Sequence, residues 1–277
     1  MTTSYQTIEV RKLTPVIGAE VFGVDLSKDL GNQQYDEVHR ALLDNLVIFF
    51  RDQQMTPDQH VALGQRFGKL HIHPNAPHLI DGRPEILVIK ADENSKRVAG
   101  EAWHSDVSCD EEPPMGSILH IHEVPANGGG DTMFANMYTA YEALSGPMQR
   151  LLEGCTAMHE SIKAHKNQHR TNRDDARYPE AEHPVIRTHP ETGRKALFVN
   201  RGFTTRIVQL ADNESDAVLE TLFRLIETPS FHCRFKWQPN SVAFWDNRAV
   251  QHYAASDYWP DVRVVERASI VGERPAA

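Results

Sequence analysis

The chain has 277 residues, of which 40% are hydrophobic and 24% charged, and its formal charge is −9. This composition is typical of a globular protein that can bury a full core without disulfides or structural metals. The negative charge would repel a nucleic acid or an anionic membrane surface, so we expect neither as a partner, and a small anionic substrate would need a local basic pocket.

The cysteines and the N-terminal residues indicate a reducing compartment. Cys109, Cys155 and Cys233 are few, odd in number and far apart, with no C-x-x-C motif. Such a set argues against a disulfide framework and against a thiolate zinc site. The first residues, MTTSYQTIEVRK, contain no apolar segment, and no apolar run approaches membrane-spanning length. We expect a cytoplasmic protein and, because no linker or repeat is visible, a single domain over residues 1–277.

Four stretches show helical signals, either an apolar periodicity of about 3.6 residues or capping residues at their ends. They are residues 33–46, the segment that follows Thr56 as cap and Pro57 as first helical residue, residues 137–154 with a break near Gly146-Pro147, and residues 213–227, which begin at an Asp/Asn cap and stop before Pro229.

Strand signals are more numerous. Short segments rich in β-branched and aromatic residues are separated by turn residues, as in the PETG turn of residues 190–193. They are LVIFFRDQ, EILVIKA, GSILHIHEV, TMFANM, HPVIRTH, KALFVN, FHCRFKW, SVAFWDN and VRVVERASIVG. Strands and helices do not alternate as in a parallel α/β sheet, and no G-x-G-x-x-G occurs. We therefore expect a mostly β fold with covering helices, a double-stranded β-helix or jelly roll.

The stretch WHSD places His104 and Asp106 two residues apart, on one face of an extended chain. Alone, this pair is more often solvated than bound to a metal. A third ligand is available in FWDNRAVQHYA, where His252 ends an apolar segment. Two imidazoles and one carboxylate form the facial triad that favours Fe(II) and leaves coordination positions open.

A pair of arginines follows on the last predicted strand. Arg263 and Arg267 share one face of VRVVERASI, about 13 Å apart. They could form cross-strand ion pairs on an exposed strand, or they could hold two different anions, because a guanidinium binds carboxylates and sulfonates bidentately. The turn PANGGGDTMF is either a simple tight turn or a close backbone approach that presents the Thr132 hydroxyl to a ligand.

Together these motifs resemble one enzyme family. WHSDV, GGGDT, ALFVNRGFTTRIV and WDNRAVQHYAASDYWPDVRVVERASIVG are similar, in order and spacing, to motifs of the taurine/2-oxoglutarate dioxygenase family of non-haem iron enzymes. The resemblance implies an enzyme that uses Fe(II), 2-oxoglutarate and O₂ to hydroxylate a small anionic substrate, with succinate and CO₂ as co-products. It implies Fe(II) ligands at His104, Asp106 and His252, a 2-oxoglutarate site at Thr132 and Arg263, and a substrate site at His73, Val107, Phe203 and Arg267.

The chain departs from the taurine enzyme at Ala76, Gly100 and Ala164-His165, where that enzyme has an aromatic residue, an asparagine and a Ser-Phe pair. In the family, the aromatic residue and the asparagine lie toward the amine and tail of the substrate, whereas the groups that bind its anionic end are the ones kept in this chain. We therefore expect a sulfonate, sulfate or carboxylate whose other end differs from that of taurine. An aryloxyalkanoate ether-cleaving dioxygenase, a non-redox cupin-like metalloenzyme and a non-catalytic binding module are the alternatives.

Three expectations complete the sequence analysis. We expect a homo-oligomer, a dimer or a tetramer. The polar segment 160–182 is a candidate for a lid over the site. The histidines outside the motifs, including His120 and His122, are interpreted as core or surface residues.

Overall fold

The structure is a computed structural model that describes residues 4–72, 79–80, 82–95, 100–163 and 178–277. Most of the ordered elements are strands. The helices are α1 (Asn32–Asn45), α2 (Pro57–Gln65), α3 (Met137–Glu142), α4 (Gly146–Leu152), α6 (Asp212–Ile226) and the 3₁₀ turn η1 (Pro229–Phe231). Among these residues, no helix is long and apolar enough to cross a membrane.

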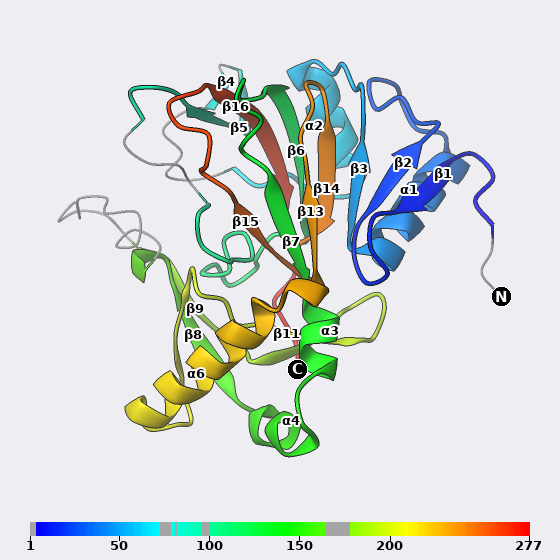
Figure 1. Ribbon diagram of the computed structural model, residues 1–277. Coiled ribbons are helices and arrows are strands. Elements are labelled where there is room, and N and C mark those ends of the chain that lie inside the picture. Colours follow the sequence, from blue (N-terminus) through cyan, green and yellow to red (C-terminus); the bar gives the residue numbers. More distant parts are fainter. Residues whose placement is uncertain (1–3, 73–78, 81, 96–99, 164–177) are drawn as a thin grey trace.

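An eight-stranded sheet dominates the fold, in the order β1-β2-β3-β14-β6-β16-β5-β4. Its pairs are antiparallel except for β2 with β3. Figure 1 shows this sheet in the upper half of the molecule. Its strands are β1 (Glu9–Lys12), β2 (Ala19–Phe22), β3 (Val47–Phe50), β4 (Leu79–Ile80), β5 (Arg83–Ala91), β6 (Gly116–Glu123), β14 (Val242–Asp246) and β16 (Arg263–Ile270).

Three small sheets complete the β structure. The sheet β13-β7-β15 joins β13 (His232–Phe235), β7 (Thr132–Asn136) and β15 (Val250–Ala254). The sheet β12-β8-β9 joins β12 (Thr204–Ile207), β8 (Thr156–Glu160) and β9 (Glu180–Pro184). The hairpin of β10 (Ile186–Thr188) and β11 (Lys195–Leu197) closes through the predicted PETG turn. Figure 1 shows α3, α4 and α6 gathered in the lower half with β8 and β9.

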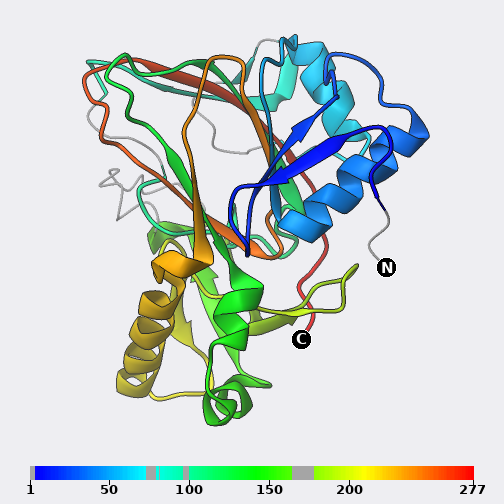
Figure 2. The ribbon, with the colours of Figure 1, turned by 45° about the vertical axis from the view of Figure 1, so that its right-hand side comes forward.

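The strands β3 and β14 at the centre of the large sheet are buried on both faces, and the side chains of β14 alternate between two cores. In β14, Ala243 and Trp245 belong to the core shared with the β13-β7-β15 sheet, while Val242 and Phe244 belong to the core under α1 and α2. Figure 2 shows both helices on the same side of this sheet. A strand buried on both faces reads as an unbroken apolar run, which explains VIFF in β3.

The predicted helices are present, with one correction. Thr56 caps α2 as expected, in a capping box with Gln59. The predicted Asp/Asn cap of the last helix is wrong, because Ala211 is the N-cap and Asp212 already lies inside α6. Glu214 accepts a hydrogen bond from the Ala211 amide at 3.1 Å, so the carboxylate at the third helical position replaces a side-chain cap.

The break predicted near Gly146-Pro147 is present. The chain leaves the helix after α3, and Ser145 then caps α4, which begins at Gly146. Gly146-Pro147 therefore begins the second helix directly after the break, as proline in a first helical turn permits. The candidate lid, residues 160–182, lies largely outside the described residues.

Candidate metal site

The structure brings His104 and His252 side by side. His104 lies in the loop between β5 and β6 and forms an isolated antiparallel bridge with His252 of β15. The His104 amide donates to the His252 carbonyl at 3.1 Å, and the His252 amide donates to the His104 carbonyl at 2.9 Å. The two rings consequently lie 4.2 Å apart between centroids.

Asp106 completes the group of three that the sequence predicted. Its Oδ1 lies 3.8 Å from Nε2 of His104 and 3.9 Å from Nε2 of His252. One potential ligand atom from each residue lies within 4.8 Å of the other two. Adjacent ligands on a metal with bonds of about 2.1 Å lie about 3 Å apart, so these atoms need to approach by about 1 Å. Two imidazoles and a carboxylate in this arrangement fit a divalent metal such as Fe(II).

Hydrogen bonds orient the His104 ring for this purpose. Its Nδ1 lies 2.7 Å from the carbonyl oxygen of Ala102, which can only accept, so Nδ1–H is the donor. The lone pair is therefore on Nε2, the atom that faces Asp106. A backbone carbonyl that fixes the tautomer in this way is a common partner of a metal-binding histidine.

Three polar side chains position Asp106. Asn247 accepts from the Asp106 amide at 2.7 Å and donates to the Asp106 carbonyl at 3.0 Å. Ser117 donates to Oδ2 at 2.9 Å and lies 3.0 Å from the Ser269 hydroxyl. With Oδ2 held by Ser117, Oδ1 is the oxygen that faces the two imidazoles.

Burial and charge keep the triad in the protonation states that bind a metal. Burial by itself would raise the pKa of Asp106, but Arg267 and the two imidazoles outweigh it and lower that pKa below its usual range. Burial and then the neighbouring His104 lower the pKa of His252 to about 3. Burial likewise lowers the pKa of His104. The three groups are therefore one carboxylate and two neutral imidazoles at neutral pH.

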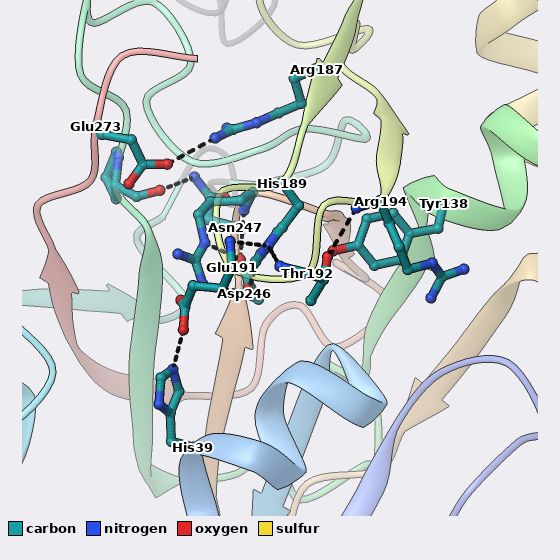
Figure 3. Close-up of polar contacts among 12 residues, drawn as sticks. His39, Tyr138, Arg187, His189, Glu191, Thr192, Arg194, Asp246, Asn247 and Glu273 are labelled. Atoms are coloured by element: carbon teal, nitrogen blue, oxygen red, sulfur yellow. Dashed lines mark hydrogen bonds and ion pairs between the residues drawn. The ribbon is translucent and has the colours of Figure 1, made fainter. Parts of the chain in front are cut away.

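A buried polar network holds the turn that carries Asn247 (Figure 3). Asp246 accepts from the Arg248 guanidinium at 2.8 and 2.7 Å and lies 3.0 Å from Nε2 of His189. Glu191 lies 2.7 Å from Arg248 and 3.0 Å from His39 of α1. This network ties the β10–β11 turn and α1 to the end of β14, immediately before β15 brings His252 to the site.

Arg267 points into the site. Its Nη1 lies 2.5 Å from Oδ1 of Asp106, and only 11% of its side chain is exposed. Its Nε has no hydrogen-bond partner within the described part of the chain, so the guanidinium retains a donor for a further anion. The alternative that β16 is an exposed strand with paired charges does not hold for this residue.

Arg263 is buried without an ion pair among the residues that the structure describes. Its guanidinium carbon lies 5.8 Å from the centre of the Trp237 ring, and the same indole donates to Oγ1 of Thr132 at 3.0 Å. Burial lowers the pKa of Arg263. A buried guanidinium without an anion is costly, so this surrounding fits a bound carboxylate.

The glycine turn packs directly against Arg263. Gly130 has φ +80°, and a Cβ there would lie 3.1 Å from Cδ of Arg263 and 3.1 Å from the Tyr258 ring. The glycine turn thus approaches Arg263 closely, and the predicted presentation of the Thr132 hydroxyl to a ligand stays a prediction.

Two of the predicted substrate residues, Val107 and Phe203, lie among the described residues near the triad. Val107 has φ +48°, an unusual conformation for a β-branched residue, directly after Asp106. The Phe203 ring lies 6.3 Å from that of His104. Gly100 has φ +96°, and a Cβ there would lie 3.8 Å from the His104 ring and 3.2 Å from Ala254. His73, Ala76 and Ala164-His165 lie outside the described residues.

Several positioning residues were missed by the sequence reasoning. They are Asn247, Ser117, Ser269 and Trp237, all polar or aromatic residues within segments that read as strands or turns. For Asn247 the sequence offered one indication of a special position, the Asp-Asn turn between two apolar segments. That turn divides the segment into β14 and β15, which belong to different sheets.

Comparison with known proteins identifies the family. Residues 9–269 match the family "Taurine catabolism dioxygenase TauD, TfdA family". The chain is 35% identical to the alpha-ketoglutarate-dependent sulfonate dioxygenase of Saccharomyces cerevisiae, over 97% of this chain and 68% of the relative. It is 35% identical to the alpha-ketoglutarate-dependent sulfate ester dioxygenase of Pseudomonas putida, over 97% of this chain and 91% of the relative.

A solved structure agrees. The structure of AAD-2 in complex with Mn(II) and N-oxalylglycine superposes with a TM-score of 0.83 at 26% identity, over 98% of this chain and all of the other (100%). The fold is thus the double-stranded β-helix expected from the sequence, and the alternatives of a non-redox metalloenzyme and a binding module are wrong. The chain belongs to the TauD/TfdA family and is an α-ketoglutarate-dependent dioxygenase.

Proposed function

We propose that this chain is an Fe(II)-dependent dioxygenase that hydroxylates a small organic anion, a sulfonate, sulfate ester or carboxylate, with succinate and CO₂ as co-products. His104, Asp106 and His252 would hold the iron. Thr132 and Arg263 would bind the distal carboxylate of 2-oxoglutarate. Arg267, His73, Phe203 and the backbone at Val107 would bind the primary substrate.

The observation that carries the proposal is the presence of two separate guanidinium groups on one strand. Arg263 is buried near Thr132 and Trp237, and no carboxylate among the described residues forms an ion pair with it. Arg267 lies at the triad, 2.5 Å from Asp106. Two separate anion sites on the strand that reaches the metal site suit a reaction with two anionic reactants, 2-oxoglutarate and the substrate.

Iron, when bound, would supply the activation of O₂ and the oxidation of a C–H bond. The chain's own residues supply orientation. Arg263 and Thr132 would fix one end of 2-oxoglutarate and so direct its keto-acid end toward the triad. Arg267 would hold the substrate's anionic group beside the triad, so that the neighbouring carbon is presented for hydroxylation. Positioning is then the main determinant of specificity.

The proposed substrate class rests on Arg267, which would bind the substrate's anionic group, and on the substrates named for the relatives. The relatives named above act on a sulfonate and on a sulfate ester. The backbone at Gly100 lies next to the His104 ring and Ala254, where a Cβ would lie 3.8 and 3.2 Å away. We propose that this glycine, where the taurine enzyme has an asparagine, helps the site accept a substrate tail different from that of taurine.

A substrate panel tests the proposal. The Fe(II)-loaded enzyme is incubated with 2-oxoglutarate and either an alkylsulfonate, an alkyl sulfate, taurine or an aryloxyacetate, and succinate and the oxidised product are measured. We expect a sulfonate or a sulfate ester to stimulate succinate formation most. Preference for the aryloxyacetate would support the ether-cleaving alternative, and preference for taurine would contradict the proposal that the site accepts a different substrate tail. If none of these anions stimulates succinate formation, the proposal that Arg267 binds the substrate's anionic group is contradicted.

A further inference from the structure

A second group of histidines lies on the opposite face of the large sheet. His120 and His122 of β6 and Glu266 of β16 each place one potential ligand atom within 4.8 Å of the other two. They belong to the same strands as Ser117 and Arg267, but they point toward α2 because alternate residues of a strand face opposite sides. The cluster therefore plays no part in the proposed dioxygenase site.

The sheet is irregular at this position. His120 lies directly opposite Glu266 in the antiparallel register, but Val265 pairs with Ile121 and Val264 with Glu123. His122 is thus the extra residue of a β-bulge. Bulges redirect a side chain, and they are frequent at functional sites. Here the bulge accompanies a separation of only 4.3 Å between the centroids of the His120 and His122 rings.

The hydrogen bonds of His120 leave a nitrogen free for a metal. Its Nε2 lies 2.9 Å from the carbonyl oxygen of Gln53, so Nε2–H donates and the lone pair is on Nδ1. His120 is 99% buried, with a relative exposure of 1%, and Nδ1 has no hydrogen-bond partner in the described residues. A buried acceptor without a partner is rare in folded proteins. The arrangement is the one that a backbone carbonyl imposes on a metal-binding histidine.

The other two members lie at ion-pair distance. Nε2 of His122 lies 3.1 Å from Oε2 of Glu266. Two ligand atoms bound to adjacent positions of one cation are also separated by about 3 Å. The His122 side chain is 33% exposed, so a cation could enter from solvent and keep water as a further ligand.

We propose that His120, His122 and Glu266 form a second metal site, for a borderline divalent cation such as Zn(II), that links β6 to β16 behind the catalytic face. Two imidazoles and one carboxylate are a ligand set that Zn(II) accepts with water in the remaining position. The site would stabilise the two central strands that also carry Ser117 and Arg267.

Zn(II) binding to the full chain tests the site. The chelator-treated protein is titrated with Zn(II) in equilibrium dialysis, and bound metal is measured by mass spectrometry. We expect two equivalents for the wild-type chain and one for H122Q. The matched control is H39Q, which removes a similarly exposed histidine lying 3.0 Å from Glu191, and it should keep two equivalents.

A second background separates this site from the catalytic one. In H104A/H252A, we expect one equivalent of Zn(II) and a rise in the unfolding temperature of about 5 °C at a hundredfold excess over Kd. Adding H122Q or E266Q should remove both effects. Fe(II)-loaded H122Q should retain 2-oxoglutarate turnover, which shows that the variant is folded. A single equivalent in the wild-type chain, or two in H122Q, would overturn the proposal.

Discussion

Asn247 binds both backbone groups of Asp106, accepting from its amide at 2.7 Å and donating to its carbonyl at 3.0 Å. The asparagine also donates to the Pro114 carbonyl at 3.0 Å and is 99% buried, with a relative exposure of 1%. It therefore fixes the backbone that aims the Asp106 carboxylate without itself reaching the triad.

We expect N247A to weaken metal binding by about 10- to 100-fold, as removal of outer-shell partners does. Mn(II) binding to the full chain, followed by electron paramagnetic resonance, measures the effect. N127A, in an exposed turn, is the control and should bind as the wild type does. Unchanged Mn(II) affinity in a folded N247A variant would show that Asp106 is positioned by other contacts.

The two arginines should affect different reactants. We expect R263A to raise the KM for 2-oxoglutarate by roughly 30-fold or more, because it removes the charge beside Thr132 and Trp237. R267A should instead raise the KM for the primary substrate, with a smaller effect on 2-oxoglutarate. Steady-state succinate formation with each reactant varied in turn checks this. Equal changes in both constants for both variants would contradict the assignment of two separate anion sites.

Asp106 should be required for coupled turnover. D106A removes the carboxylate of the triad and leaves Arg267 buried without its partner at 2.5 Å. We expect weaker metal binding and loss of succinate formation, measured with the Fe(II)-loaded variant, while circular dichroism reports whether it is folded. Full activity of D106A would exclude this residue from the metal site.

The buried network around Asp246 should contribute strongly to stability. D246N would leave the Arg248 guanidinium, which is 4% exposed, with a weakened partner. We expect a loss of about 3–5 kcal/mol in the free energy of unfolding, measured by urea denaturation. The control E142Q breaks an ion pair with the exposed Arg194 and should cost at most about 0.5 kcal/mol. A similarly small loss in D246N would mean that Glu191 alone holds Arg248.

Stability should fall as pH is lowered below neutrality. Burial and then the neighbouring His183 lower the pKa of His159 to about 3, against about 6.5 in an unfolded chain. Between these values the unfolded chain binds more protons, so the folded state's advantage is complete above pH 6.5 and decreases toward pH 3. At pH 5 the loss from this residue is about 2 kcal/mol.

Urea denaturation at pH 7.5 and pH 5.0 checks this expectation in the wild type and in H159Q. The difference between the two pH values should be smaller in H159Q by about 2 kcal/mol. An equal pH difference in the wild type and in H159Q would show that His159 is not the titrating group.

Local sequence determined much of the fold and the composition of the candidate site. Residues such as Val47–Phe50 read as a strand because both faces are buried, and Thr56-Pro57 began a helix through capping chemistry alone. The cap of α6 was misread because Asp212 and Asn213 resemble caps, whereas the side chain of Glu214 binds the amide of Ala211. The position of the first helical residue depends on which of several local hydrogen bonds forms once the helix is packed.

The sequence by itself determined which side chains are available: two imidazoles and a carboxylate in recognisable motifs, and two arginines on one face of a strand. Only the tertiary structure decided which atoms meet, because His104 meets His252 through a single bridge between a loop and β15, and Asp106 is held by Asn247. It also separated Arg267 from the His120, His122 and Glu266 cluster, since neighbouring residues of β16 face opposite sides of the sheet. Contacts between residues far apart in the chain depend on strand pairing and register, which local patterns do not encode.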